Sequence, residues 1–277
     1  MLRFEPLEYD NSRILLIDGD ILVYRASALS EGATSPSLSF DVVAGMMQRF
    51  QADMQTTEYA IMFSDSTTFR HYLYSDYKSN RKAPKPSFYE VVKQYTVKNY
   101  FCTRWPYVEA DDAVVSEATA FVDGGELTPI IVSLDKDLKQ VPNTFFYNLV
   151  TGAVEAITQE AAYTNLFLQC LTGDAVDHIG GIKGVGKKKA EKLIANHCIT
   201  NHDELYTAVL EVCLLYGYTE RDAQAVFDCV VMQRNLPSIS LSGWGVHGLT
   251  CENFPYDADQ GAFNGYVYEG RIPNLPI

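Results

Sequence analysis

Short apolar segments that alternate with amphipathic helical segments are the feature that most constrains the fold of this chain. Apolar segments short enough for buried strands lie at residues 14–17, 59–64, 100–104 and 129–133. Apolar residues at helical spacing lie between them, at Val42, Val43, Met46, Met47 and Phe50 and at Val114, Val115, Ala118 and Phe121. This alternation is typical of βαβ units. We therefore expect an α/β fold with a mostly parallel central sheet flanked by helices.

The second half of the chain has a different pattern. From residue 158 almost to residue 236 the apolar periods are helical, with one glycine-rich break at residues 180–186. Residues 238–277 show no period and are rich in Gly, Pro, Asn and aromatic residues. We therefore expect an α/β core at residues 1–157 that includes a mobile basic segment at 70–98, a helical region at 158–237, and an irregular tail at 238–277.

No segment suggests a membrane protein or an extracellular one. The longest aliphatic run, at residues 14–17, is far below the roughly 20 residues that a spanning helix needs. Residues 1–10 carry acids instead of a basic leader, and the 6 cysteines include no CxxC pair. We expect a soluble protein of a reducing cytoplasm.

Acidic residues follow three of the predicted strands. Asp18 follows the first strand, Asp65 the second, and Asp135 and Asp137 the fourth. The carboxyl ends of parallel strands share one edge of a sheet, where ligand crevices form. Each acid alone could instead cap the helix that follows it. Three strands that each deliver an acid to one edge favour a binding site.

More acids stand at two other places. Glu109, Asp111 and Asp112 open a helical segment, and Asp174 and Asp177 precede the glycine-rich break. Acids are ordinary in a first helical turn because they complement the helix dipole. Nine carboxylates in one crevice would repel one another strongly unless cations lay between them. Oxygen ligands alone favour Mg²⁺ or Mn²⁺ over zinc.

Basic residues are concentrated in two segments. The formal net charge is −13, yet residues 70–104 hold eight Lys or Arg against two acids, and residues 183–192 hold five Lys against one Glu. Local charge decides where a polyanion docks, so both segments are candidates for nucleic acid binding. In the first, Lys78 and Arg81 could clamp a phosphodiester. The alternative is an ordinary surface loop.

The glycine-rich break contains two possible motifs. Gly181, Gly186 and Lys187 match the P-loop spacing, but Lys188 stands where that motif needs Ser or Thr, and no apolar strand precedes it. We prefer a helix-hairpin-helix turn, in which backbone amides at a helix start bind phosphate. The alternative is a structural corner with solvated lysines. The residues of this turn assigned to DNA binding are Lys183, Gly184, Gly186, Lys187, Lys188 and Lys189.

Five segments together resemble the 5′-nuclease superfamily of flap endonucleases, the 5′ nuclease domain of bacterial DNA polymerase I, and bacteriophage 5′ to 3′ exonucleases, the last most of all. The segments are IDGDILVYR (17–25), YKSNR (77–81), VEADD (108–112), SLDKD (133–137) and GDAVDHIGGIKGVG (173–186). They occur in the family's order over residues 14 to about 195. The resemblance implies a PIN-like nuclease core with a helix-three-turn-helix subdomain.

The resemblance also implies roles for individual residues. The metal cluster would comprise Asp18, Asp65, Glu109, Asp111, Asp112, Asp135, Asp137, Asp174 and Asp177. Catalysis would rest on Asp18, Asp135, Lys78 and Arg81, the last two as bases of a gateway helix. DNA would further contact Arg25, Tyr77 as a stacking platform, and Lys82. The short segment between Arg81 and Phe88 argues against a long closed arch, and we assign no role to Asp20.

The expected activity is hydrolysis of duplex DNA, and of RNA–DNA hybrids, from 5′ ends, nicks or flaps by a monomer with two or more Mg²⁺ ions, which Mn²⁺ could replace. Such an enzyme would act in the host cytoplasm in phage DNA replication, primer removal or host DNA degradation. Two alternatives remain: a catalytically silent DNA-binding protein of the same fold, and a Mg²⁺-dependent phosphatase of small molecules suggested by Asp18 and Asp20. Repulsive carboxylates would not help a binding module, and a phosphatase leaves the lysines of residues 183–192 unexplained.

Overall fold

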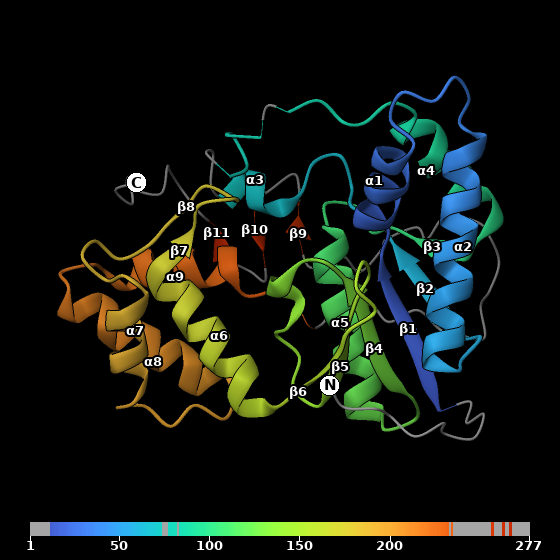
Figure 1. Cartoon of the computed structure of the whole chain (residues 1–277). Coiled ribbons are helices and arrows are strands. Elements are labelled where there is room, and N and C mark those ends of the chain that lie inside the picture. The colour runs from blue at the N-terminus through green and yellow to red at the C-terminus, as the bar shows by residue number, and fades with distance from the viewer. Residues whose placement is uncertain are drawn as a thin grey trace.

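The computed structural model describes residues 12–73, 77–81, 83–232 and 234, together with the backbone of three short strands between residues 256 and 267. Its α/β part is built on a six-stranded sheet in the order β3-β2-β1-β4-β5-β6 (Figure 1). The strands are β1 (Arg13–Asp18), β2 (Tyr59–Met62), β3 (Cys102–Thr103), β4 (Thr128–Ser133), β5 (Thr144–Asn148) and β6 (Val154–Ile157).

Strand β1 lies at the centre of this sheet. It pairs in parallel with β2 and with β4, and β6 is the one antiparallel strand of the six. The register sets Ile17 opposite Val132 of β4 and Asp18 opposite Met62 of β2. Because the strands run in parallel, the last residues of β1 and β4 arrive together at one edge, as the sequence predicted.

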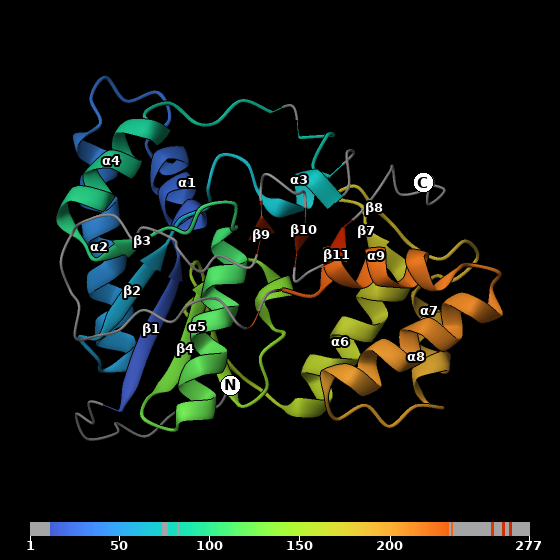
Figure 2. The same ribbon diagram turned by 180° about the vertical axis from the view of Figure 1, so that it is seen from behind.

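Helices cover both faces of the sheet (Figure 2). Helices α1 (Gly19–Leu29), α2 (Ser37–Met54) and α4 (Tyr89–Asn99) pack on the face of Leu15 and Ile17, and α5 (Ala110–Gly124) packs on the face of Ile14 and Leu16. Adjacent residues of a strand point to opposite faces, so a strand buried on both sides is a continuous apolar run. The α/β fold class expected from the sequence is confirmed.

The helical part has its own core. The helical part comprises α6 (Gln159–Thr172), α7 (Lys187–Ile194), α8 (His202–Leu215) and α9 (Glu220–Val230). These helices enclose the buried residues Leu166, Val209 and Val226. Helix α6 begins at Thr158, whose side chain accepts a hydrogen bond from the amide of Ala161. This N-cap explains why the helical pattern starts there.

A short hairpin joins α6 to the turn before α7. Each of its strands, β7 (Gly173–Asp174) and β8 (Ile179–Gly180), is two residues long. A Cβ on Gly173, whose φ is +70°, would lie 2.4 Å from the carbonyl oxygen of Ile179, and one on Gly181 would lie 2.3 Å from the carbonyl of Thr172. Only glycine fits where two backbones approach so closely. The hairpin is therefore fixed against the end of α6.

The structure differs from the sequence expectation at several elements. Strand β3 is only two residues long. Strands β5 and β6 were not predicted, because they become clear only when β5 pairs with β4 and β6 pairs with β5. Of the basic segment, residues 70–73 lie in α3 (Phe69–Leu73), residues 77–80 form a turn, and residues 89–98 lie in α4. Most of the predicted tail lies outside the described residues, apart from the antiparallel strands β9 (Tyr256–Asp257), β10 (Ala262–Phe263) and β11 (Tyr266–Val267). No helix in the described part is long and apolar enough to cross a bilayer.

Candidate active site

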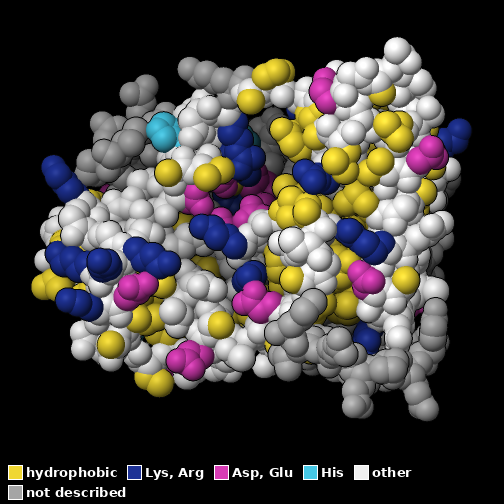
Figure 3. All heavy atoms as spheres, viewed as in Figure 1, with side chains coloured by type: hydrophobic (Ala, Val, Ile, Leu, Met, Phe, Trp, Pro, Cys, Tyr) yellow, Lys and Arg dark blue, Asp and Glu magenta, His cyan; other side chains and the backbone are white. Residues whose placement is uncertain are grey.

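Acidic side chains from both parts gather where the carboxyl ends of β1 and β4 face the helical region. In Figure 3 they lie in a hollow near the middle of the molecule, with basic side chains beside them. Seven of the nine predicted ligands are brought together there: Asp18, Glu109, Asp111, Asp135, Asp137, Asp174 and Asp177. The site is thus assembled from four separate segments of the chain.

Asp18 lies at the sheet end of this cluster and is only 2% exposed. One carboxylate oxygen accepts a hydrogen bond from the amide of Ile21, and the other accepts one from the Ser133 hydroxyl at 2.9 Å. Burial, with the nearby charges of Asp20 and Asp135, raises the pKa of Asp18 to about 7. Its carboxylate therefore lacks a compensating positive charge in the metal-free protein.

Asp137 and Asp174 join the two parts of the molecule. Burial and the neighbouring charge of Asp135 raise the pKa of Asp137 to about 7, and it forms a side-chain hydrogen bond with Asp174. Burial would raise the pKa of Asp174, but this hydrogen bond and those from the amides of Val176 and Asp177 outweigh it and lower that pKa. Each of the two carboxyl groups thus shifts the pKa of the other across the junction.

Helix α5 supplies the next acids. Its N-cap is Glu109, and Asp111 lies in its first turn. Burial, followed by the charge of Asp18, raises the pKa of Asp111 well above its ordinary value. Asp111 thus adds an under-compensated carboxylate to those of Asp18 and Asp137.

Asp112 of the same turn faces away from that group. It is fully buried and accepts a hydrogen bond at 2.8 Å from the guanidinium of Arg70, which also lies 3.3 Å from Glu109. The Arg70 Nε donates to the carbonyl of Cys229 in α9. This buried pair therefore connects α3, α5 and α9, and the helical spacing that the sequence predicted for Glu109 and Asp112 serves to share Arg70.

The turn at residues 77–80 rests on the hairpin. The Lys78 amide donates to the carbonyl of Asp177 at 3.0 Å, and its ammonium lies 2.7 Å from Glu109 and 3.7 Å from Asp177. The Arg81 guanidinium binds Asp177 as well. Lys78 has a φ of 54°, which a continuous helix does not allow. Both bases reach the acids, but from a turn instead of the helix that the resemblance implies.

Other predicted residues lie in different settings. Tyr77 is 4% exposed and packs in the helical core, with its hydroxyl donating to Glu109 at 2.7 Å. In this arrangement its ring offers no face on which a nucleobase could stack. Asp65 accepts hydrogen bonds from the amides of Ser66 and Tyr107. Arg25 lies half-buried on α1, and Lys82 lies outside the described residues. Asp20, which received no role, binds the Ser64 amide and the Tyr89 hydroxyl.

The lysines of residues 183–192 surround the start of α7. Gly184 has a φ of +81°, and Gly186 is an N-cap without a side chain to bind the first amides of the helix. Lys187 and Lys188 are exposed, and Lys189 lies over the ring of Tyr216. The turn therefore presents backbone N–H groups and cationic side chains on one surface.

The comparisons with known proteins decide the family. The family model of the 5′–3′ exonuclease N-terminal, resolvase-like domain matches residues 13–166. The chain belongs to this 5′–3′ exonuclease family.

Individual relatives agree. The exonuclease of Escherichia phage T7 is 30% identical over 224 residues, which cover 73% of this chain and 72% of the relative. The flap endonuclease Xni of Shewanella piezotolerans is 30% identical over 197 residues, which cover 66% of this chain and 76% of the relative. A bacteriophage T5 flap endonuclease, in a complex with DNA and metal ions, superposes with a TM-score of 0.61 at 13% identity over 79% of this chain and 88% of that chain. At 13% identity, the similarity to the T5 structure shows a shared fold.

The donor set of this exonuclease-family site fits divalent cations. All its candidate ligands are carboxylate oxygens, and burial and mutual repulsion raise the pKa values of Asp18, Asp111 and Asp137 in the absence of cations. As these side chains stand, no three acids of the described residues converge closely enough to hold an ion. Several of these carboxylates are instead held by hydrogen bonds to protein groups, such as that of Asp18 with Ser133 and that of Glu109 with Tyr77. The nine-residue metal cluster stays a prediction.

Some contributors to the site gave no signal in the sequence. The sequence pattern placed Arg70 only within a basic segment and assigned no role to Ser133. Arg70 is 2% exposed, and Ser133 is fully buried against Asp18. Their roles depend on partners 42 and 115 residues away, which no local pattern reveals.

Proposed function

We propose that this chain hydrolyses phosphodiester bonds of duplex DNA from 5′ ends, with two or more Mg²⁺ ions that Mn²⁺ can replace. The observation that carries the proposal is the meeting of seven acids with the bases Lys78 and Arg81 at the junction of the two parts. The names of its relatives, an exonuclease and a flap endonuclease, support the same reaction class.

The acids would hold the ions. The under-compensated carboxylates of Asp18, Asp111 and Asp137 would bind most directly, together with Asp135 and Asp174. When bound, Mg²⁺ lowers the pKa of an attacking water and stabilises the leaving 3′ oxygen. Ser133 would orient Asp18 through its 2.9 Å hydrogen bond. We keep Asp65 and Asp112 as predicted members of the cluster, although both have other partners.

Lys78 and Arg81 would bind the phosphate. In the DNA-free protein their charges are paired with Glu109 and Asp177. A bound phosphodiester competes for the same cations, so both side chains would turn from carboxylate to phosphate and neutralise the charge of the transition state. Glu109 and Asp177 would hold these bases beside the site until DNA arrives.

The start of α7 would grip the duplex. The exposed Lys187 and Lys188 and the uncapped amides of the helix start suit the phosphate backbone, which carries no sequence information. Binding would therefore depend on backbone shape, and an RNA strand of an RNA–DNA hybrid would also be degraded from its 5′ end. We expect a monomer acting in the cytoplasm of a phage-infected host.

The test compares linear duplex, nicked circle, closed circle and a 5′-flapped duplex, with Mg²⁺ and with EDTA. We expect cutting of linear duplex and nicked circle in Mg²⁺ and none in EDTA. Equal cutting of closed circles would contradict dependence on ends, and strong preference for the flap would make the protein a flap endonuclease. Binding without cutting in any metal would identify the silent DNA-binding alternative.

A further inference from the structure

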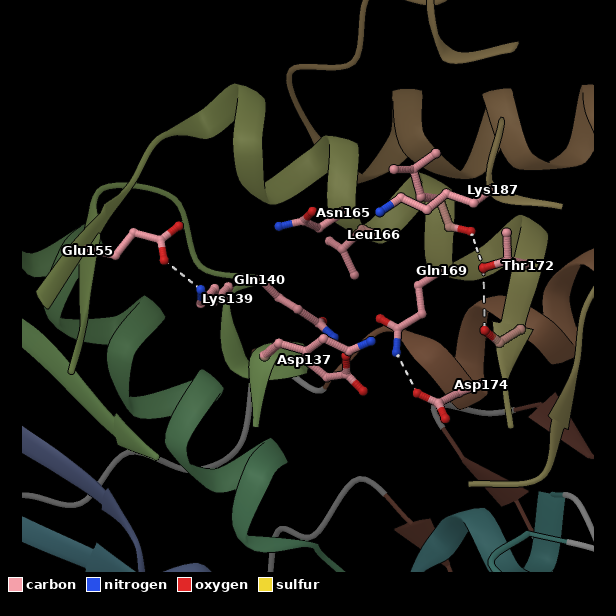
Figure 4. A pocket seen from close by; sticks show the side chains of 13 residues that line it. Asp137, Lys139, Gln140, Glu155, Asn165, Leu166, Gln169, Thr172, Asp174 and Lys187 are labelled. Atoms are coloured by element: carbon pink, nitrogen blue, oxygen red, sulfur yellow. Dashed lines mark hydrogen bonds and ion pairs between the residues drawn. The ribbon is translucent and has the colours of Figure 1, made fainter. Parts of the chain in front are cut away.

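A second cavity adjoins the acidic site. It has a volume of about 460 Å³ and lies between the loop after β4, helix α6 and the start of α7 (Figure 4). Asp137, Gln169 and Asp174 line both this cavity and the acidic site, so the two spaces adjoin at these residues. A chain of nucleotides bound at the acids could therefore extend into this cavity without leaving the surface.

The cavity is lined by three lysines and three acids. Lys139 forms an ion pair with Glu155 at 2.5 Å. Lys136 and Lys187, which line the cavity from different elements, form no ion pair among the described residues, and both are exposed. They are therefore the two lysines of the lining that a phosphate can approach, although the charge of Lys136 also acts on the neighbouring Asp137.

The remaining lining suits a nucleotide unit. Figure 4 shows Asn165 and Lys187 on one side of the cavity, with Asp137 and Asp174 on the other. Asn165 is exposed, and its side chain forms no hydrogen bond within the described residues, so its side-chain amide can donate to a ligand. The partly buried Leu168 adds an apolar surface. The volume falls within the roughly 300–1,000 Å³ of small-ligand sites.

We propose that this cavity is a second phosphate-binding subsite, in which Lys136 and Asn165 bind the phosphate of the nucleotide next to the one being cleaved. The inference rests on the proposed function, because it takes the acidic site as the place of cleavage. It adds a ligand position, with Lys136 and Asn165, that the predicted DNA-binding residues do not include. Lys187 would contribute from the duplex grip.

The test measures binding in EDTA by fluorescence anisotropy, so that it does not depend on cleavage. Duplexes carry a single neutral methylphosphonate at each linkage near the 5′ end in turn. We expect one of these linkages to weaken binding of the parent protein about tenfold. Lys136→Ala and Asn165→Asp should weaken binding of the all-phosphate duplex by a similar factor, and should add little further loss on the duplex neutral at that linkage.

The matched control is Arg221→Ala, which removes an equal charge from the exposed first turn of α9, outside both basic segments. It should leave binding unchanged at every linkage. If Lys136→Ala weakens all duplexes by the same factor, or none of them, Lys136 does not contact that phosphate and the proposal is overturned. Because Lys136 and Asn165 are exposed, neither substitution should disturb folding.

A free 5′-mononucleotide is the competing ligand. If Lys136→Ala weakens inhibition by a mononucleotide but leaves duplex binding unchanged, the cavity holds a released product and the strand subsite is wrong. Failure of the parent protein to cleave in Mg²⁺ would instead overturn the proposed function. The anisotropy result would still decide whether the cavity binds a phosphate of the strand.

Discussion

The ammonium of Lys78 lies 2.7 Å from the carboxylate of Glu109, so a base expected to meet the substrate is held by an acid of the same site. The Tyr77 hydroxyl also donates to Glu109, at 2.7 Å. Burial alone would raise the pKa of Glu109, but Lys78 and Arg70 lower it to about 2. Glu109 thus stays ionised over the whole range in which such an enzyme would work, and it positions Lys78 in the absence of DNA.

Replacing Lys78 by Ala should lower the single-turnover rate at saturating DNA by about 100-fold, with a much smaller loss of binding, because a contact to the transition state affects the rate more than affinity. Rapid-quench cleavage and a binding titration measure the two effects. The control is Arg221→Ala, which removes an exposed cation of α9 outside both basic segments. A change in the dissociation constant alone would make Lys78 a docking residue.

Asp135→Asn should abolish cleavage, with a loss of more than about 100-fold, and should leave duplex binding equal or tighter. The substitution removes a candidate metal ligand and also a charge that repels phosphate. A cleavage assay in Mg²⁺ and a gel shift in Ca²⁺ test both parts, with the exposed Asp41→Asn on α2 as control. Cleavage within about tenfold of the parent protein would contradict the metal assignment.

Neutralising Lys187 and Lys188 together should weaken binding equally on all DNA sequences. It should also reduce the slope of the logarithm of affinity against the logarithm of salt concentration by about 1 to 2. A variant that makes fewer phosphate contacts releases fewer counterions from the DNA when it binds. A salt titration on two unrelated duplexes provides the measurement. Unchanged affinity would return the turn at residues 183–186 to a purely structural role.

Arg70→Met should lower the free energy of unfolding by about 3 kcal/mol, because it removes the guanidinium that binds the fully buried carboxylate of Asp112. Urea unfolding measures the loss. The double variant Arg70→Met with Asp112→Leu should recover part of it, since the buried carboxylate is then removed together with the guanidinium. A single variant as stable as the parent protein would show that the ion pair does not hold α3, α5 and α9 together.

The metal-free protein should become less stable as the pH rises from 6 to 8. Asp18 and Asp137 have pKa values of about 7 in the folded state, above the ordinary 3.8. A raised pKa stabilises the protonated folded state, and this stabilisation is complete below pH about 4 and is lost as the pH rises through about 7. Thermal melts in EDTA should show the fall, and Mg²⁺ should reduce it. Asp18→Asn should flatten it as well, and an equal fall in that variant would exclude Asp18 as a cause.

Local pattern was sufficient for much of the fold and for the composition of the site. The run of Ile14 to Ile17 and the spacing of Val114 and Ala118 predicted a sheet with a covering helix, because the burial of a strand or helix leaves a period in the sequence. Short motifs likewise identified the acids, since parallel strands deliver their ends to one edge. Strands β5 and β6 were not predicted because pairing, of β5 with β4 and of β6 with β5, makes them strands more than their own composition does.

Which acids share a site and which have other partners was decided by tertiary structure. Asp111 and Asp112 are neighbours in the sequence, yet one joins the acidic cluster and the other binds the buried Arg70. The helical turn sends their side chains about 100° apart, and only the packing of α3 and α9 against α5 supplies Arg70 on one of those sides. The sequence by itself determined that carboxylates and bases would be present in the right elements. The folded chain determined their partners, because burial and charge pairing depend on residues far away along the chain.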